Sequence, residues 1–393
     1  MRIYLDNAAT TAVFPEVIDL MLRELSQTGN PSSLHANGRE ARKDVEVARE
    51  QVAGALHCRA NEVIFTAGGT EADNLAIKGL YWLAKDTNPE KNIVIVSAIE
   101  HHAVLDPALW LQSSGQATVL FAPVDSVGRV DVDALEALLL EHRDHVALIS
   151  VMWANNEVGT IQPIREISEL AEKFGVLFHT DAVQAIGSLP VKFDDLPIDA
   201  MTISGHKLGG PMGVGALILK RELKAIPLLH GGGQEREIRS GTLATHLIAG
   251  FGAAIELAVK NQPEYAKQVS ALRDAFIRAV ESIVDGAKLM GDRNERLPGN
   301  AHFCFDGTEG DALLMLLDAN GVSCSTGSAC TAGIAQPSHV LLAMGLSESE
   351  AIGALRFSFG RTSTLKDVET VVDLLPEIVA RARRAGKTTV RTS

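Results

Sequence analysis

Cysteine is scarce in this sequence. Only four of the 393 residues are cysteines, namely Cys58, Cys304, Cys324 and Cys330, and their spacing is irregular. This excludes the dense disulfide framework of a small secreted domain, and there is no CxxC pair that could form a metal knuckle. We therefore expect reduced thiols and no metal site.

The sequence also has no excess of basic residues and no long apolar run. Lys and Arg number 36 against 49 Asp and Glu, so the formal net charge is −13. This argues against nucleic acid or an anionic membrane as the main partner, because either would need a basic face. No apolar run reaches about 18 residues, and the N-terminal MRIYLDNAATT has no apolar stretch of signal-peptide length. We expect a cytoplasmic protein.

Aromatic residues make up only 5% of the chain, whereas 46% of the residues are hydrophobic. A chain of this length and composition can bury a large core and is typical of a globular protein of about two domains.

Short apolar runs alternate with amphipathic segments along the first part of the chain. The runs are residues 63–67, 92–97, 146–152, 176–181, 200–204 and 215–220. Near-continuous apolar strands that alternate with helices predict an α/β fold, with a mainly parallel sheet between layers of helices. Between these strands, Thr70 followed by Asp73 predicts a helix that begins with a capping box.

The pattern changes near residue 260. Longer helical segments, such as 271–283, are mixed with a few strands, such as 300–305. We predict a large domain over residues 15–260. Residues 1–14 and 261–393 are predicted to form a smaller α+β domain, because chain ends often lie close together.

Polar residues collect where the predicted strands end. TAGGTE (66–71) leaves a strand through two glycines and enters a helix, which exposes backbone N–H groups to a phosphate; a plain glycine turn is the alternative. HTDAVQ (179–184) ends a strand at Asp181, whose burial requires a cationic partner. MWANNEVG (152–159) and IEHHAV (99–104) follow two further strands. A histidine or asparagine in such a loop is more often structural. Because ligands bind beyond the carboxyl ends of parallel strands, the four junctions together favour a functional site.

One lysine connects these junctions. Lys207 lies in SGHKLGGPMGVG, between a histidine and several glycines. A lysine amine can form a Schiff base with an aldehyde, and pyridoxal phosphate sites combine such a lysine with an acid for the ring nitrogen and a phosphate cradle. Asp181 supplies the acid. The residues available for the cradle are Gly69, Thr70, Ser204 and His206.

A second cluster, CSTGSACTAG, contains two glycines and no large apolar residue. It predicts a mobile loop over about residues 322–335. Cys330 lies among small neighbours there, as expected of an accessible reactive thiol, although an idle loop cysteine is the alternative. Cys58 and Cys304 are expected to be packing residues. Cys324 is either structural or an occasional partner of Cys330.

Arg356 lies in the predicted strand LRFSFGR. Its guanidinium could bind a carboxylate through two hydrogen bonds, and a surface ion pair is the equally ordinary alternative.

Taken together, these motifs resemble the cysteine desulfurases of the class V aminotransferase superfamily, in the group that includes the nitrogen-fixation and iron–sulfur-cluster sulfur donors. The similarity covers nearly the whole chain, from YLDNAATT (4–11) through GGTEADNLAIKG, EHHAVLD, NNEVG, HTDAVQ, SGHK, HGGGQEREIRSGT and GSACT to LRFSFGR.

Departures from the family pattern are small: His102 stands where relatives often have lysine, and TAGI follows Cys330 where many have TSAS or TSGS. The long loop around Cys330 resembles the subgroup with a mobile cysteine rather than the short-loop subgroup to which selenocysteine lyases belong.

The resemblance implies a homodimeric pyridoxal 5'-phosphate enzyme of fold type I that converts L-cysteine to L-alanine. The sulfur would pass as a persulfide on Cys330 to an acceptor protein, such as an iron–sulfur scaffold or a tRNA-thiolation protein. Lys207 would carry the cofactor, and His101 would stack on its ring and relay protons. Thr70, Ser204 and His206, with Thr242 of the neighbouring subunit, would bind the phosphate of the cofactor. Asp181 would bind the ring nitrogen, and Gln184 would bind the ring oxygen. Arg356 and Asn156 would bind the substrate carboxylate, and Asn156 would also lie beside the cofactor.

Other functions remain to be distinguished. A conventional aminotransferase or a selenocysteine lyase on the same fold would differ at the Cys330 loop. A nicotinamide dehydrogenase is suggested by GFGAAI (250–255), but this match lacks the third glycine and follows a helical stretch instead of a strand. A non-catalytic scaffold would require the lysine, the aspartate and the phosphate loops all to be coincidental.

Overall fold

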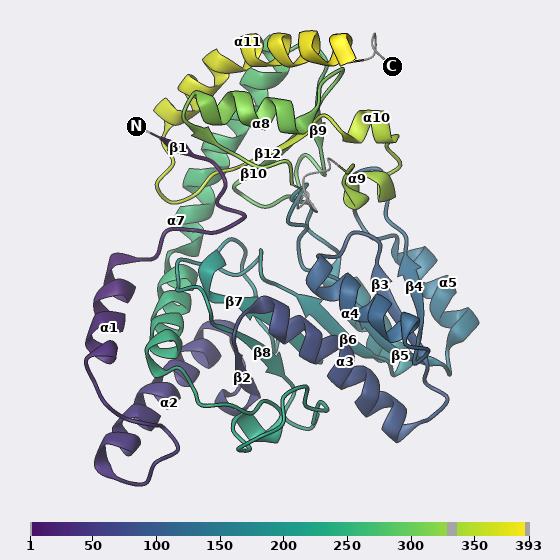
Figure 1. Cartoon of the computed structure of the whole chain (residues 1–393). Coiled ribbons are helices and arrows are strands. Elements are labelled where there is room, and N and C mark those ends of the chain that lie inside the picture. Colours follow the sequence, from purple (N-terminus) through teal and green to yellow (C-terminus); the bar gives the residue numbers. More distant parts are fainter. Residues whose placement is uncertain (1, 328–335, 390–393) are drawn as a thin grey trace.

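A seven-stranded sheet forms the centre of the larger part of the computed structural model, which describes residues 2–327 and 336–389 (Figure 1). Its strands are β2 (Val63–Thr66), β3 (Ile93–Ser97), β4 (Thr118–Ala122), β5 (Val146–Ser150), β6 (Leu177–Asp181), β7 (Ala200–Ser204) and β8 (Gly215–Leu219). Their order is β2-β8-β7-β6-β5-β3-β4. All neighbouring pairs are parallel except those made by β8, which runs antiparallel to β2 and β7. The predicted mainly parallel α/β sheet is confirmed.

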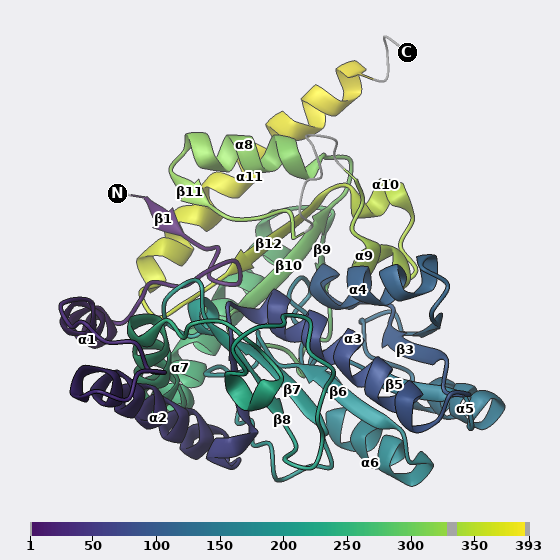
Figure 2. The same ribbon diagram turned by 60° about the horizontal axis from the view of Figure 1, so that its bottom comes forward.

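Helices cover both faces of this sheet because alternate residues of the strands point to opposite sides. Ile64 and Val94 belong to a cluster with α3 (Gly69–Thr87) and α4 (His102–Ser113). Phe65 and Ile95 belong to the cluster on the other face. The helices of that second cluster are α1 (Pro15–Leu25), α2 (Ala36–Leu56), α5 (Val132–His142), α6 (Ile164–Phe174) and the first half of α7 (Thr245–Ile283). Figure 2 shows these helices flanking the sheet.

A second, smaller group of elements lies above the carboxyl-terminal edge of the large sheet in Figure 1. Its strands are β9 (Ala287–Met290), β10 (Asn300–Phe305) and β12 (Ala354–Ser358), which form an antiparallel sheet, and β1 (Ile3–Tyr4) and β11 (Val322–Ser323), which pair in parallel. Its helices are α8 (Gly310–Ala319), α9 (His339–Ala343), α10 (Glu348–Ala351) and α11 (Leu365–Thr389). Short 3₁₀ turns elsewhere are η1 (Ala60–Glu62), η2 (Gly205–Lys207) and η3 (Glu235–Glu237).

The long helix α7 connects the two groups. Ala258 packs in the core on the α2 face of the large sheet, whereas Val269 packs in the core of the smaller group, which also includes Leu5 from the N-terminal segment. The predicted domain division at residue 260 falls inside this helix. The division of the chain into two domains at this residue stays a prediction, and we propose residue 260 as the boundary.

Two local features differ from the sequence-based expectations. The strand β4 was not predicted, although its sequence TVLFA contains a short apolar run; it is an edge strand with partly exposed side chains. The predicted capping box of Thr70 and Asp73 is wrong, because α3 begins at Gly69 and Asp73 is buried. Within the described residues, no helix combines the length and apolar character needed to cross a membrane.

Candidate active site

One cavity of about 390 Å³ lies at the carboxyl ends of the central strands, beneath β12 of the smaller group. The predicted site residues that line it are Gly69, Thr70, His101, Asn156, Asp181, Gln184, Ser204, His206, Lys207 and Arg356. The structure therefore brings ten of the twelve predicted site residues together around one space. Thr242 and Cys330 are the two exceptions.

The topology explains this convergence. Asp181 is the last residue of β6, and Ser204 is the last residue of β7 and leads into η2, which ends at Lys207. The loops after β3 and β5 bring His101 and Asn156 to the same edge. The carboxyl ends of neighbouring parallel strands meet at one edge of a sheet, so residues far apart in the sequence become neighbours.

Lys207 is held by the N-terminal segment. Its Nζ donates hydrogen bonds to the carbonyl oxygens of Ala8 at 2.5 Å and Ala9 at 2.9 Å. Burial and the nearby charge of Arg356 lower the pKa of Lys207 to about 8, although Asp181 and Asp6 oppose this shift. More of the amine is therefore uncharged near neutral pH than for a surface lysine.

Asp181 is buried, with only 6% of its surface exposed. Its Oδ1 accepts a hydrogen bond from the N–H of Val183 at 2.8 Å. Burial raises the pKa of Asp181 to about 6, and the N–H of Val183 and the charge of Lys207 act in the opposite direction. Lys207 acts on Asp181 only through its charge, since its amine donates hydrogen bonds to Ala8 and Ala9. A positively charged ring nitrogen in the cavity would supply the missing partner.

The start of α3 forms one end of the cavity. No side chain of the described residues caps this helix, so its first N–H groups and the positive end of its dipole are available to a phosphate. A Cβ added at Gly69 would lie 3.1 Å from Cγ2 of Val183 and 3.4 Å from Cβ of Ser204, so the backbone passes closely between these side chains. Thr70, Ser204 and His206 line the same end.

Both histidines of the cavity are neutral near pH 7. Burial, together with the charge of Lys207, lowers the pKa of His101 to about 4 and that of His206 to about 4. The N–H of Ala103 donates to Nδ1 of His101 at 3.0 Å, which leaves the ring proton on Nε2. His101 is also the N-cap of α4, so this backbone contact fixes its ring at the edge of the cavity.

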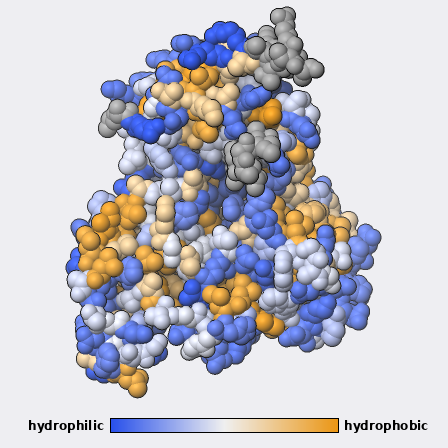
Figure 3. Space-filling model, viewed as in Figure 1, coloured by the Kyte–Doolittle hydropathy of each residue, from blue (hydrophilic) through white to orange (hydrophobic). Residues whose placement is uncertain are grey.

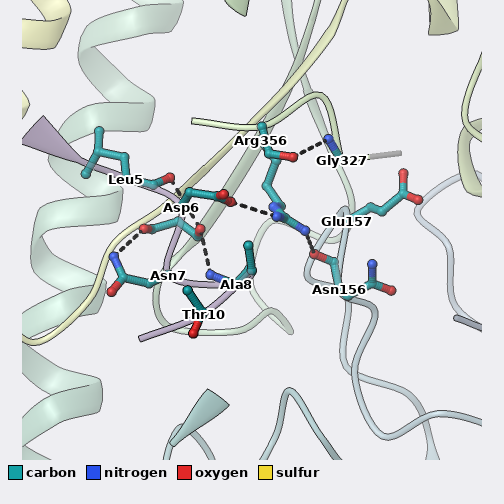
Figure 4. A network of polar contacts seen from close by, with 12 residues as sticks. Leu5, Asp6, Asn7, Ala8, Thr10, Asn156, Glu157, Gly327 and Arg356 are labelled. Atoms are coloured by element: carbon teal, nitrogen blue, oxygen red, sulfur yellow. Dashed lines mark hydrogen bonds and ion pairs between the residues drawn. The ribbon is translucent and has the colours of Figure 1, made fainter. Parts of the chain in front are cut away.

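Arg356 enters the cavity from β12. Its Nη2 donates to Oδ1 of Asp6 at 2.9 Å, and its Nη1 donates to the backbone carbonyl of Asn156 at 2.8 Å (Figure 4). The Nε of Arg356 is buried and has no hydrogen-bond partner among the described residues. Arg356 also lines the cavity, so its positive charge would attract a carboxylate bound there.

Sequence reasoning assigned no role to the N-terminal residues Asp6, Ala8 and Ala9, which hold Arg356 and Lys207. The available signal was the polar DNAATT run directly after an apolar strand. Backbone carbonyls carry no sequence signature, so the contacts of Ala8 and Ala9 could only be found in the fold.

Two predicted site residues, Cys330 and Thr242, are not among those that line this cavity. Cys330 belongs to residues 328–335, which are outside the described residues. Thr242 is exposed on the segment before α7 and does not line the cavity. Two residues just before Cys330, Ser325 and Gly327, do line it.

The three described cysteines are poor nucleophiles. Burial raises the pKa of Cys58, Cys304 and Cys324 to about 12 in each case, so almost none of their thiols is ionised near neutral pH. In the described part of the chain, no group of three or more His, Cys, Asp and Glu side chains is arranged to hold a metal ion.

Comparisons with known proteins agree with this geometry. The family described as Aminotransferase class-V matches residues 3–371. An IscS-like cysteine desulfurase of Mycobacterium tuberculosis is 52% identical over 384 residues, which cover 98% of each chain. The cysteine desulfurase IscS of Clostridium botulinum is 45% identical, over 97% of this chain and 95% of that protein.

Solved structures show the same relationship. A NifS-like protein superposes with a TM-score of 0.89 at 36% identity, covering 97% of this chain and 100% of that one. A NifS-like protein from Rickettsia africae gives a TM-score of 0.86 at 32% identity, with 96% and 99% of the two chains covered. The chain therefore belongs to the class V aminotransferase family, among its cysteine desulfurases.

Proposed function

We propose that this chain is a pyridoxal 5'-phosphate-dependent cysteine desulfurase, which converts L-cysteine to L-alanine and holds the released sulfur as a persulfide on Cys330. The observation that carries this proposal is the convergence of Lys207, Asp181 and the uncapped start of α3 on one cavity. An amine, a buried carboxylate and an anion-binding helix end are the three groups that a pyridoxal phosphate site needs.

The residues of the cavity fit the cofactor. The phosphate would bind the N–H groups at the start of α3, together with the side chains of Thr70, Ser204 and His206. Asp181, whose carboxylate contacts no cation within the described residues, would bind the protonated ring nitrogen, and Lys207 would hold the aldehyde carbon. When bound, pyridoxal phosphate draws electrons away from the substrate Cα.

The remaining polar groups would orient the substrate. Arg356 would bind the α-carboxylate through its free N–H groups, and the side chain of Asn156 lines the cavity close to it. Nζ of Lys207, with its lowered pKa, would take the proton from Cα. Nε2 of His101 would pass a proton to or from the substrate at the ring face.

The sulfur step balances without an external oxidant or reductant. The thiolate of Cys330 attacks the sulfur of the substrate, so an S–S bond forms while the Cβ–S bond breaks, and Cβ finally takes a proton. The sum is L-cysteine plus a thiol giving L-alanine plus a persulfide. Cys330 is favoured as the acceptor because Cys304 and Cys324 are buried, Cys58 is half-buried, and the pKa of each of these three thiols is raised to about 12. The chain from Gly327, which lines the cavity, to Cys330 also spans at most about 11 Å.

We also propose that two copies of this chain associate and that each supplies Thr242 to the phosphate of the other. The support is an exposed apolar face on α1, where Ile18, Leu22 and Leu25 are 47%, 61% and 58% exposed (Figure 3). Apolar side chains at this helical spacing on a surface mark a protein contact. An acceptor protein for the sulfur and a cytoplasmic location, where thiols stay reduced, complete the proposal.

The direct test is to incubate the purified protein with pyridoxal phosphate, L-cysteine and a thiol reductant, and to measure alanine and sulfide. We expect equal amounts of both products. Cys330→Ser is expected to keep the visible absorption of the bound cofactor and to release no sulfide, whereas Lys207→Ala is expected to lose both. Amino transfer from L-cysteine to a 2-oxo acid without sulfide would instead indicate an aminotransferase. Turnover of L-selenocysteine but not L-cysteine would indicate a selenocysteine lyase.

A further inference from the structure

Arg356 is held on both sides before any substrate arrives. Asp6 accepts from Nη2 at 2.9 Å and the carbonyl of Asn156 accepts from Nη1 at 2.8 Å, so each terminal nitrogen of the guanidinium has its own fixed partner. Figure 4 shows the guanidinium between these two partners. The side chain of Arg356 is only 5% exposed and that of Asp6 is 22% exposed, so the ion pair is largely shielded from water.

The backbone fixes the position of Asp6 relative to Arg356. Ser358, two residues after Arg356 on β12, donates its N–H to the carbonyl of Leu5 at 2.7 Å and accepts from the N–H of Asn7 at 3.2 Å. Its Oγ also accepts from the N–H of Ala8 at 2.9 Å. Asp6 therefore lies in a segment that is paired with the strand that carries Arg356, and the ion pair is built into the fold.

We propose that Asp6 is a positioning residue for substrate recognition: it fixes the guanidinium of Arg356 so that its unused N–H groups face the α-carboxylate of the substrate. This inference rests on the proposed function, since it assigns Arg356 to the substrate carboxylate. The supporting observation is the buried Nε of Arg356, which has no acceptor among the described residues although Nη1 and Nη2 are bound. A buried donor without an acceptor is costly, so the guanidinium is not fully satisfied by its two fixed partners, and Arg356 lines the cavity in which the carboxylate would bind.

Two effects of Asp6 on carboxylate binding oppose each other. Its negative charge partly offsets the charge of Arg356, which weakens the attraction of the cavity for an anion. Its hydrogen bond to Nη2 orients the guanidinium, which strengthens a directional contact. Asp6→Ala removes both effects, whereas Asp6→Asn removes the charge and keeps an oxygen that can accept from Nη2. The pair of variants therefore separates orientation from charge.

The test is to titrate the holoenzyme with L-alanine, and separately with ethylamine, while following the visible absorption of the bound cofactor. The two ligands present the same amine, but only L-alanine carries a carboxylate. Because orientation dominates, we expect Asp6→Ala to weaken L-alanine binding about tenfold, the loss of one charge-assisted contact, and to leave ethylamine binding unchanged. Asp6→Asn is expected to stay within about twofold of the unsubstituted protein for both ligands. In steady-state assays, Asp6→Ala should raise KM for L-cysteine more than it lowers kcat.

The outcomes distinguish this inference from the proposed function. If Asp6→Ala binds L-alanine as well as the unsubstituted protein does or more tightly, or if both ligands weaken equally, Asp6 does not position Arg356. If the unsubstituted protein releases no sulfide from L-cysteine, the proposed function fails instead, while the binding comparison still reports on Asp6. Should Asp6→Ala not fold, as judged by its thermal unfolding, weakened L-alanine binding by Asp6→Asn would itself contradict the inference.

Discussion

Lys207 illustrates how neighbouring residues tune a single reactive group. Burial and the positive charge of Arg356 lower the pKa of its amine to about 8. The uncharged amine is the form that attacks an aldehyde, so this environment suits the cofactor-binding role proposed for Lys207. The carbonyl oxygens of Ala8 and Ala9 keep the amine at the edge of the cavity.

This tuning predicts how cofactor loading depends on pH. The rate at which cofactor-free protein gains visible absorption after addition of pyridoxal phosphate should rise with pH and level off above about 8, where the amine has lost its proton. Arg356→Gln should move this midpoint to higher pH, because a charge that lowers the pKa of Lys207 has been removed. Arg361→Gln, which removes an arginine that is not among the charges acting on Lys207, is the matched control. Equal midpoints in all three proteins would refute the assigned role of Arg356 in this shift.

At the residue scale, the sequence allowed prediction of those site residues that follow a strand end. Lys207, Asp181 and Ser204 each lie at or directly after the end of an apolar run, and the sheet brings them together. Asp6 escaped prediction because its partner is 350 residues away and the pairing depends on how the N-terminal segment runs beside β12. Cys330 was predicted from its small neighbours, and its role stays a prediction.

Among the elements, α3 shows why the phosphate end is sensitive to a single added side chain. The helix begins without a side-chain cap from the described residues, and Gly69 passes close to Val183 and Ser204. An added side chain must displace these neighbours or lift the first turn of the helix away from a phosphate. Overpacking of this kind costs about 1–3 kcal/mol.

We therefore expect Gly69→Val to lower the affinity for pyridoxal phosphate by about tenfold or more, since about 1.4 kcal/mol corresponds to a factor of ten. The affinity is measured by absorption during titration of the cofactor-free protein. Gly54→Ala on α2 is the matched control, because Gly54 is exposed and no described atom lies within 4 Å of the added Cβ. This control should leave affinity unchanged and stabilise the fold by about 1 kcal/mol. Wild-type affinity in Gly69→Val would remove α3 from the phosphate site.

At the scale of elements, burial decides how well a strand could be predicted. Six strands of the large sheet are buried on both faces, so their apolar runs were visible in the sequence. The edge strand β4 also has a short apolar run, in TVLFA, but its side chains are partly exposed and it was not predicted. The capping box failed because the carboxyl of Asp73 lies 3.7 Å from Nε2 of the buried His179, and tertiary packing overrode a local pattern.

Across the whole molecule, buried ionisable groups make stability depend on pH in opposite directions. Glu100 is fully buried, and burial raises its pKa to about 8. The folded chain therefore keeps this proton where the unfolded chain has lost it, so the contribution of Glu100 is present at acid pH and is lost as the pH rises towards 8. Burial lowers the pKa of His179 to about 3. The unfolded chain binds that proton first, so stability is lost as the pH falls below about 6.5.

Glu100→Gln isolates the first of these effects. Its amide can still accept from Ser97 Oγ and from the N–H of Met152, the two donors that contact Oε1 of Glu100. Between about pH 5 and about pH 7.5, the free energy of unfolding of the variant should gain about 3 kcal/mol relative to that of the unsubstituted chain. Urea unfolding of the cofactor-free proteins measures this difference, with the exposed Glu90→Gln as control. A difference that does not change with pH would mean that Glu100 is ionised in the folded state.

At the scale of the whole molecule, the central claim is the proposed sulfur transfer: groups around the cavity would activate L-cysteine, and the thiol of Cys330 would take its sulfur. Mass spectrometry of the holoenzyme after brief exposure to L-cysteine, without reductant, measures this transfer directly. We predict that the peptide containing Cys330 gains the mass of one sulfur atom, that this gain is reversed by a thiol, and that it is absent in Lys207→Ala. Release of sulfide with no added sulfur on Cys330, or the added sulfur on Cys58, Cys304 or Cys324 instead, would contradict the account.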